Sequence, residues 1–278
     1  MTDINTPGAH LDANQYQADA IAKYEAVYGE HFVSPGGAAS ARACIKRLHL
    51  QPGMRVLDVG CGLGGSAFLM AREHGVSVHG IDLSANMLAS ARKRVRSLGL
   101  ASQVTLEHVD VLALPGTFHY DVIYSRDVFL HIHDKARLMG LLRGLLFRGG
   151  LLFFTDYGRG EGEPSKEFAA YVAQREYDLR TVHGYRALLE QAGFVQVTAE
   201  DHTAEFVSIL QAELARIADD TAHADIRKSW LDKIERAVAQ LKTPPSFADQ
   251  LYILRGHVGM VRRRLEGDRP EPAPAAPG

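Results

Sequence analysis

The chain has 278 residues, of which 46% are hydrophobic, and this is enough for a full core in one large domain with added elements. Its formal net charge of −2 provides no basic surface, so neither a nucleic acid nor a membrane is expected as a partner. Cys44 and Cys61 are the only cysteines, which excludes a disulfide scaffold and favours a cytoplasmic location.

The N-terminal 50 residues precede the first predicted strand. The segment 1–14 is polar and lacks the apolar core of a signal peptide, and no stretch of the chain is long and apolar enough to predict a membrane span. Helical composition is seen over residues 12–31 and again over residues 38–48. Because 50 residues are more than a simple lead-in to the first strand needs, we expect residues 1–50 to form a helical lid over a ligand site.

The most informative stretch is RVLDV at residues 55–59, a short apolar strand that runs into a turn containing Gly60 and Gly62 and then into a helix ending near residue 74. Strand, glycine turn and helix are typical of a nucleotide-binding α/β domain. Asp58, inside the strand, would repel a diphosphate but suits an ammonium group. A second strand over 76–81 ends at Asp82, which can accept the hydroxyls of a ribose.

A ligand with a ribose and an amino acid but no phosphate is S-adenosylmethionine, so we predict this cofactor. The alternative is an NAD-binding Rossmann domain. The thirteen histidines show no paired ligand spacing, and we predict no metal.

Helices and strands alternate through the central part of the chain. Ser84 is expected to cap a helix over 85–98, followed by strands at 104–108 and 120–125, a helix at 135–147 and a strand at 151–155. This order predicts a doubly wound, mostly parallel sheet that binds ligands at the carboxyl ends of its strands. Polar residues stand at or near five of those ends: Asp58, Asp82, Asp110, Arg126 with Asp127, and Asp156 with Tyr157.

The C-terminal part departs from this alternation. Helices are predicted over 166–178 and 181–192, a strand over 195–200, a long helical region over 203–242, and a last strand near 258–262. We therefore divide the chain into a lid (1–50), a core (51–202) with a cap insertion near 158–180, a helical extension (203–265) and a disordered tail (266–278).

The motif VLDVGCGLGG, followed by GIDLS, resembles the class I methyltransferases. This resemblance implies a Rossmann-like α/β fold, and we assign cofactor binding to Asp58, Gly60, Gly62, Asp82, Leu83, Asp110, Val111 and Arg126. Outside the glycine turn, the motifs NQY, YEAVYGEHFVSPGG, IYSRDVFLHI, TDYG and QREY resemble the phosphoethanolamine N-methyltransferases.

The second resemblance implies an enzyme that methylates the amine of phosphoethanolamine or of a similar small anionic amine. It places Tyr16 and His131 over the reacting amine as catalytic residues. It assigns the substrate phosphate to Tyr157, Arg175 and Tyr177, and the substrate pocket or its wall to Gln15, Val33, Ser34 and Asp127.

Several alternatives stay open at this point. His133 competes with His131, and Arg175 would equally suit an ion pair on a solvated helix face. The family also uses a C-terminal lysine for the phosphate, whereas no lysine or arginine lies between Lys242 and Arg255 here. This difference leaves S-methylation of methionine as a second candidate function, and a non-catalytic S-adenosylmethionine sensor as a third.

Overall fold

The computed structural model describes residues 12–13, 16–218, 224, 227–228, 231, 234–235 and, for the backbone alone, 252–258. Its centre is a seven-stranded sheet with the order β3-β2-β1-β4-β5-β7-β6. The strands are β1 (Arg55–Val59), β2 (Ser77–Asp82), β3 (Val104–His108), β4 (Tyr120–Arg126), β5 (Leu146–Gly158), β6 (Val197–Asp201) and β7 (Tyr252–Val258).

The pairings of β1 to β5 with one another are all parallel, whereas β7 pairs antiparallel with both β5 and β6. The strand order reverses between β1 and β4, and the carboxyl ends of these two strands flank the crevice in which open α/β sheets bind ligands. The fold is the Rossmann-like α/β fold that the sequence predicts.

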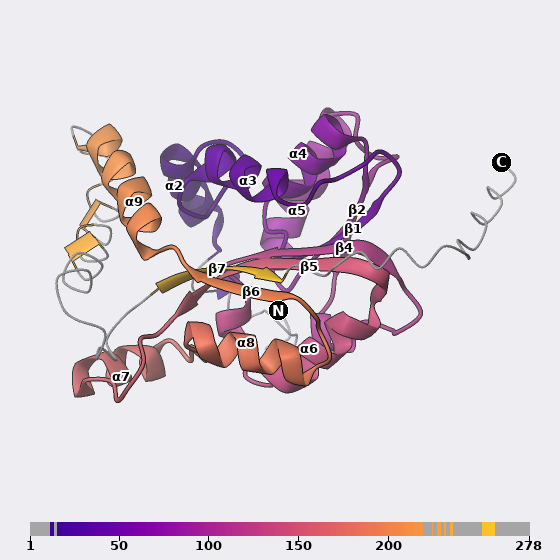
Figure 1. Ribbon diagram of the computed structural model, residues 1–278. Coiled ribbons are helices and arrows are strands. Elements are labelled where there is room, and N and C mark those ends of the chain that lie inside the picture. The colour runs from indigo at the N-terminus through magenta and orange to yellow at the C-terminus, as the bar shows by residue number, and fades with distance from the viewer. Residues whose placement is uncertain are drawn as a thin grey trace, which may run out of the picture.

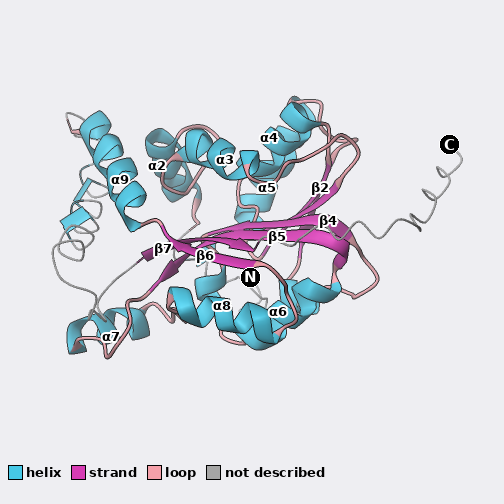
Figure 2. Cartoon of the chain, viewed as in Figure 1, coloured by secondary structure: helices cyan, strands magenta, loops and turns pink. Residues whose placement is uncertain are grey.

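Helices cover both faces of the sheet (Figures 1 and 2). One layer holds α2 (Ala18–Tyr28), α3 (Gly37–Lys46), α4 (Gly65–His74), α5 (Ala85–Ser97) and α9 (Thr203–Ile217). The other holds α6 (Lys135–Gly144), α7 (Lys166–Gln174) and α8 (Val182–Gln191).

The apolar core is divided by the sheet because successive strand residues point to opposite faces. Val56 and Val122 pack in the core beneath the first layer, and Leu57 and Ile123 pack in the core on the other side. Asp58 follows in this alternation on the same face as Val56, beneath the layer that contains α2 to α5. Asp58, the one acidic residue of β1, therefore faces the layer that contains α2 to α5.

The largest difference from the sequence prediction is at the end of α6. The helix ends at Gly144, and β5 begins at Leu146, although a helix was expected to continue through residue 147. An apolar run of this kind fits either element, and pairing of Leu146 with Tyr120 decides for the strand. Gly149, at a φ of 82°, lies inside β5, next to the register shift between Tyr120 and Val122.

The last strand also differs from its predicted position. It spans Tyr252–Val258, about six residues before the predicted one, and it lies between β5 and β6 in the sheet. Strand β2 begins one residue later than expected, and α7 ends at Gln174 where a helix to residue 178 was expected. The predicted disordered tail (266–278) lies outside the described residues.

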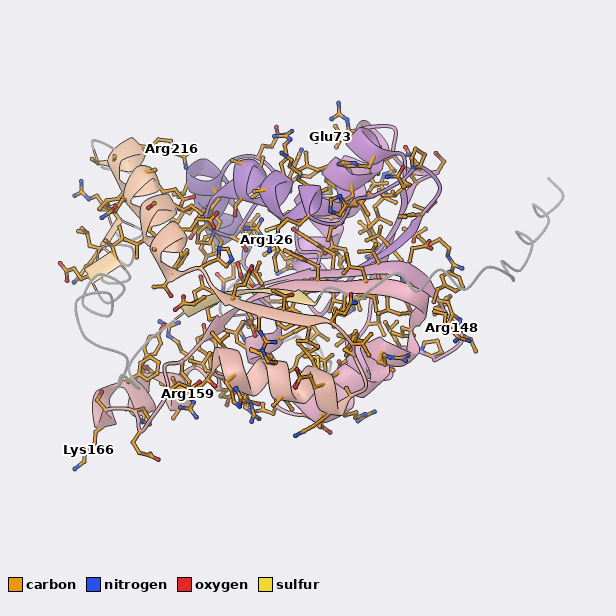
Figure 3. The ribbon with its side chains drawn as sticks, in the orientation of Figure 1. Glu73, Arg126, Arg148, Arg159, Lys166 and Arg216 are labelled. Atoms are coloured by element: carbon orange, nitrogen blue, oxygen red, sulfur yellow. The ribbon has the colours of Figure 1, made fainter. Side chains whose placement is uncertain are left out.

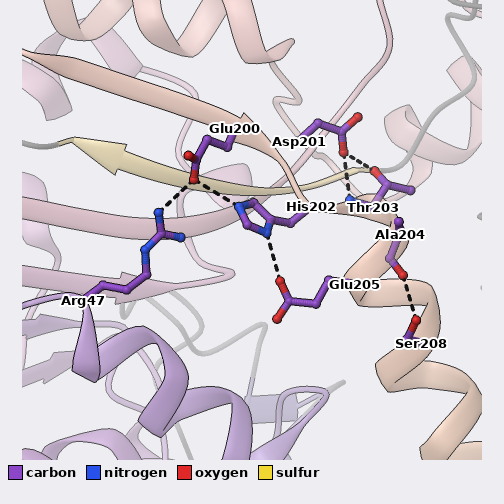
Figure 4. A network of polar contacts seen from close by, with 8 residues as sticks. All are labelled: Arg47, Glu200, Asp201, His202, Thr203, Ala204, Glu205 and Ser208. Carbon is purple, nitrogen blue, oxygen red and sulfur yellow. Dashed lines mark hydrogen bonds and ion pairs between the residues drawn. The ribbon is translucent and has the colours of Figure 1, made fainter.

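A polar network links the start of α9 to the C-terminal end of α3 (Figure 4). Glu200 of β6 accepts a hydrogen bond of 2.8 Å from Arg47, next to α3, and its carboxylate also lies 3.1 Å from the His202 ring. The other ring nitrogen of His202 lies 2.9 Å from Glu205 in the first turn of α9. The side chains of this network are partly exposed, so each ion pair adds little stability.

Candidate active site

The glycine turn brings the backbone close to its neighbours. Gly60 has a φ of 71°, and a Cβ there would lie 2.2 Å from a methyl group of Val128. The N–H groups of Gly60 and Cys61 donate to the Ile81 carbonyl at 2.8 and 3.0 Å, which ties the turn to the end of β2. Only glycine fits Gly60, because both the backbone conformation and the available space exclude a side chain.

Asp58 is a buried carboxylate whose Oδ2 has no hydrogen-bond partner among the described residues. Burial and then the charge of Asp82 raise the pKa of Asp58 to about 7, against the opposing effect of Arg126. A buried carboxylate without a partner costs stability, so its natural complement is a ligand cation. The ammonium group of an amino acid moiety fits this requirement.

Asp82, at the end of β2, is hydrogen-bonded to the glycine turn. Its Oδ2 accepts a hydrogen bond from the Gly62 N–H, and its Oδ1 accepts one from the Ser84 N–H, both at 2.8 Å. Burial raises the pKa of this carboxyl as well. Each carboxylate oxygen retains a second acceptor position, which suits the hydroxyl groups of a ribose.

Two neighbouring cavities open at this edge of the sheet, with volumes of about 140 and 50 Å³. They share five lining residues: Val33, Ser34, Gly60, Gly62 and Arg126. The larger cavity is also lined by Tyr16, Asp82, Leu83, Asp110, Val111, Asp127 and His131, and the smaller one by Asp58. All the predicted cofactor residues and both predicted catalytic residues therefore meet in one crevice.

Arg126, the last residue of β4, and Asp127, which follows it, line the larger cavity. Arg126, between the sheet and the helices α2 and α3 (Figure 3), donates from Nη2 to the Pro35 carbonyl at 3.0 Å. Asp127 adopts a φ of 58°, and its Oδ1 accepts a hydrogen bond of 2.8 Å from the Thr155 hydroxyl. A left-handed aspartate is uncommon, and this one turns the chain from β4 into the 3-10 segment η2 (Phe129–His131).

Both His131 and His133 are exposed, but only His131, at the end of η2, lines the larger cavity. The His131 ring also meets the Tyr177 ring edge-on, with 5.2 Å between centroids. The surrounding protein and then the Lys135 charge lower the pKa of His131, although part of the ring reaches solvent. The ring is therefore neutral at pH 7 and able to accept a proton.

The pKa of Tyr16 is shifted upward, whereas that of His131 is shifted downward. Burial and then the charge of Asp82 raise the pKa of its hydroxyl, so Tyr16 keeps its proton and acts as a donor. The two predicted catalytic residues thus have different roles: only His131 can serve as a base near neutral pH.

The segment that carries Tyr16 is attached to the start of α5. The Asp12 carboxylate accepts hydrogen bonds from the Ser84 hydroxyl and from the Ala85 N–H, the latter at 3.0 Å. Asn86 in turn donates from its side chain to the Tyr16 carbonyl at 3.0 Å. We call the described residues Asp12, Ala13 and Tyr16 the N-terminal strap. Sequence reasoning missed Asp12, because its partner Ser84 is 72 residues away.

The predicted phosphate-binding residues lie beside the cavity, not in its lining. Tyr177 hydrogen-bonds with Arg175, whose guanidinium carbon is 4.7 Å from the centre of the Tyr171 ring. Arg175 is exposed and makes no ion pair with any described residue, so its charge is available to an anion. Tyr157 packs against Phe206 at 5.8 Å, and Gln15 lies outside the described residues.

Two further observations concern other classes of site. The described helices include none that is both long and apolar enough to cross a membrane. No cluster of three metal-binding side chains occurs in the described part of the chain.

The sheet order, the glycine turn and the paired carboxylates define a class I methyltransferase. A family model described as a methyltransferase domain matches residues 50–220. Phosphoethanolamine N-methyltransferase 1 of Zea mays is 42% identical over 240 residues, which cover 82% of this chain and 48% of that protein. Phosphoethanolamine N-methyltransferase of Plasmodium falciparum is 32% identical, with 77% of this chain and 80% of that protein covered.

Among solved structures, Haemonchus contortus phosphoethanolamine N-methyltransferase 2, in complex with phosphomonomethylethanolamine and S-adenosylhomocysteine, superposes with a TM-score of 0.78. It is 33% identical, and the match covers 88% of this chain and 57% of that one. The chain belongs to the phosphoethanolamine N-methyltransferase family, and it spans about half the length of the plant relatives it matches.

Proposed function

We propose that this chain transfers a methyl group from S-adenosylmethionine to the amine of phosphoethanolamine or of a closely similar anionic amine. The observation that carries the proposal is the meeting, in one crevice, of the Asp58 and Asp82 carboxylates with a neutral His131 and a protonated Tyr16. The first pair suits the amino acid and ribose of the cofactor, and the second suits an amine acceptor.

The cofactor supplies a methyl group that is bonded to a sulfonium. A nucleophile in line with this bond would take the methyl group, and S-adenosylhomocysteine would leave. An amine with a pKa near that of lysine is almost fully protonated at pH 7 and has no lone pair to offer. His131 would accept its proton, and Tyr16 and Asp127 would orient the nitrogen. Alignment of this kind can lower a barrier by up to roughly 7–11 kcal/mol.

The anionic group of the acceptor would meet Arg175 and Tyr177, with Tyr157 on the same side of His131. Arg175 offers a planar fork for an oxyanion and Tyr177 a phenolic donor. Tyr177 connects this pair to the cavity, because its ring contacts His131 and its hydroxyl hydrogen-bonds with Arg175. This arrangement supports an acceptor that is held at one end by its anion and at the other by its amine.

We also propose that residues 1–50 act as a lid. Both cavities are smaller than the roughly 300 Å³ typical of small-molecule pockets, so the covering residues would have to move to admit ligands. A cytoplasmic location is proposed on the basis of the two cysteines, both of which are buried thiols.

The test is turnover of a panel that contains phosphoethanolamine and methionine, with wild type, His131→Ala and Arg175→Ala. For an amine acceptor, His131→Ala should lower turnover by about 10²–10⁴-fold at pH 7 and recover partly toward pH 10, where solvent supplies the neutral amine. Arg175→Ala should weaken acceptor binding first, because it removes a charge-assisted contact.

A flat pH profile of His131→Ala with methionine as the accepted substrate would replace this proposal with S-methylation. Binding of S-adenosylhomocysteine without methyl transfer to any member of the panel would point to a sensor.

A further inference from the structure

A buried group of charges lies directly behind His131. Lys135, the first residue of α6, is only 1% exposed, yet its Nζ donates to the carbonyls of Phe129 and Ile132, both at 2.9 Å. A lysine is rarely buried to this extent, and desolvation lowers its pKa. These two carbonyls flank His131, so the ammonium holds the backbone on both sides of that residue.

Asp156 and Asp178 bind the main chain of Leu130 in the same turn, Asp156 through its carboxylate and Asp178 through its backbone N–H. Asp156, at the end of β5, accepts a hydrogen bond of 3.1 Å from the Leu130 N–H, and its other oxygen accepts one from the Tyr185 hydroxyl. The Asp178 N–H donates to the Leu130 carbonyl at 2.8 Å, and the Asp178 carboxylate lies 3.5 Å from Lys135 Nζ.

The placement of these carboxylates in the sequence links the turn to the acceptor side of the crevice. Asp178 follows Tyr177, whose ring meets His131, and Asp156 precedes Tyr157. The network therefore fixes His131, Tyr157 and Tyr177 relative to one another. We propose that Lys135, with Asp156 and Asp178, is a set of positioning residues that holds the His131 turn in its reactive geometry.

Stability alone does not account for this arrangement. Buried ion pairs often contribute less than apolar residues of the same volume, so a buried lysine between two aspartates needs another reason. The charge of Lys135 also acts on His131, lowering the pKa of the ring and keeping it neutral. The wall of the larger cavity presents Asp82, Asp110, Arg126 and Asp127 to the same space, together with the uncharged Tyr16. The uncharged Tyr177 contacts the His131 ring from beside the cavity.

This inference rests on the proposed function, because it assumes that His131 accepts a proton. A first measurement is independent of activity: the His131 ring is titrated by nuclear magnetic resonance with ring-labelled histidine, and its signal is assigned by its loss in His131→Gln. Lys135→Met should raise the pKa of His131, since the variant removes a positive charge. An unchanged His131 pKa in a folded Lys135→Met protein would overturn the proposal, whichever acceptor the enzyme uses.

A second measurement uses Tyr185→Phe, which removes one hydrogen bond to Asp156 and no charge, and so stays informative if Lys135→Met does not fold. Tyr120→Phe is its matched control, because Tyr120 is also buried and its hydroxyl lies 2.6 Å from the His79 ring, at the opposite end of β4. Tyr185→Phe should lower kcat by roughly 10–100-fold with unchanged affinity for S-adenosylhomocysteine, as expected for a misplaced base. Equal effects of the two variants on kcat would contradict the positioning role.

Discussion

Asp58 is held by the fold in an environment that favours its uncharged form. Its pKa rises from 3.8 in an unfolded chain to about 7 here, chiefly by burial. Between these pH values the carboxyl is protonated in the folded protein and ionised in the unfolded chain. Its contribution to stability is therefore complete below pH 4 and is lost as the pH rises through 7. An ammonium ligand would offset the free-energy cost of ionising Asp58 in the folded protein, since it pairs with the ionised carboxylate.

We predict that Asp58→Asn separates stability from binding. Without ligand, the variant should have a higher Tm than wild type at pH 8, by about 2–4 °C for each kcal/mol recovered, and the difference should shrink toward pH 4. Wild type should bind S-adenosylhomocysteine more weakly at pH 6 than at pH 8, approaching tenfold for each pH unit below 7.

Asp58→Asn should lose both this affinity and its pH dependence in a calorimetric titration. Asp121→Asn is the control, because Asp121 lies at the far end of β4, where it accepts a hydrogen bond from the Arg55 N–H. Equal affinity of wild type at pH 6 and pH 8 would show that the ligand ammonium does not meet Asp58.

At the scale of elements, the N-terminal strap is hydrogen-bonded to Ser84, Ala85 and Asn86 at the start of α5. Asp12 satisfies the first N–H groups of α5, the helix that begins just after Asp82 and Leu83. Ser84 caps the same helix by accepting a hydrogen bond of 3.1 Å from the Met87 N–H. Loss of a cap costs about 0.5–2 kcal/mol, so the contacts of Asp12 contribute modestly to the stability of this helix start.

We predict that Asp12 acts on turnover through Tyr16. Asp12→Ala alone should lower kcat/KM, whereas in a Tyr16→Phe background it should have little further effect, because the side chain that it positions is already changed. Thr181→Ala serves as control, since Thr181 caps α8 in the opposite layer. Additive effects of Asp12→Ala and Tyr16→Phe would mean that the strap does not act through Tyr16.

Elements with strong local signals were predictable from the sequence. β1 and β3 have the predicted bounds, and Ser84 caps α5, because apolar alternation and a capping serine are local features. The boundary between α6 and β5 was wrong, because Leu146 has no local preference that outweighs its pairing with Tyr120. Lys135 was missed because a lysine at the start of a helix normally predicts exposure, and its partners Asp156 and Asp178 come from distant segments.

At the scale of the whole molecule, the crevice is bordered by elements from both ends of the chain. Gly36, which follows Ser34 and Pro35, donates its N–H to the Glu213 carboxylate of α9 at 2.6 Å. Arg126 holds the Pro35 carbonyl from the sheet side, and Asp12 holds the strap to α5. A ligand that binds in the crevice would contact segments that are attached both to the strap and to α9.

This connection predicts that ligand binding stabilises the molecule beyond the sheet. S-adenosylhomocysteine at 100 times its Kd should raise the free energy of unfolding by about 2.7 kcal/mol. In hydrogen exchange followed by mass spectrometry, it should slow exchange in α2 and α9 as well as around the glycine turn. Glu25 of α2 accepts a hydrogen bond from the N–H of His31, which lines the smaller cavity, and α9 binds Gly36, two residues after the lining residue Ser34. Glu213→Ala should weaken the protection of α9 more than that of α2, since it removes the hydrogen bond that ties α9 to Gly36. If the ligand protects only the segments around β1, β2 and β4, the lid and α9 respond independently of the site.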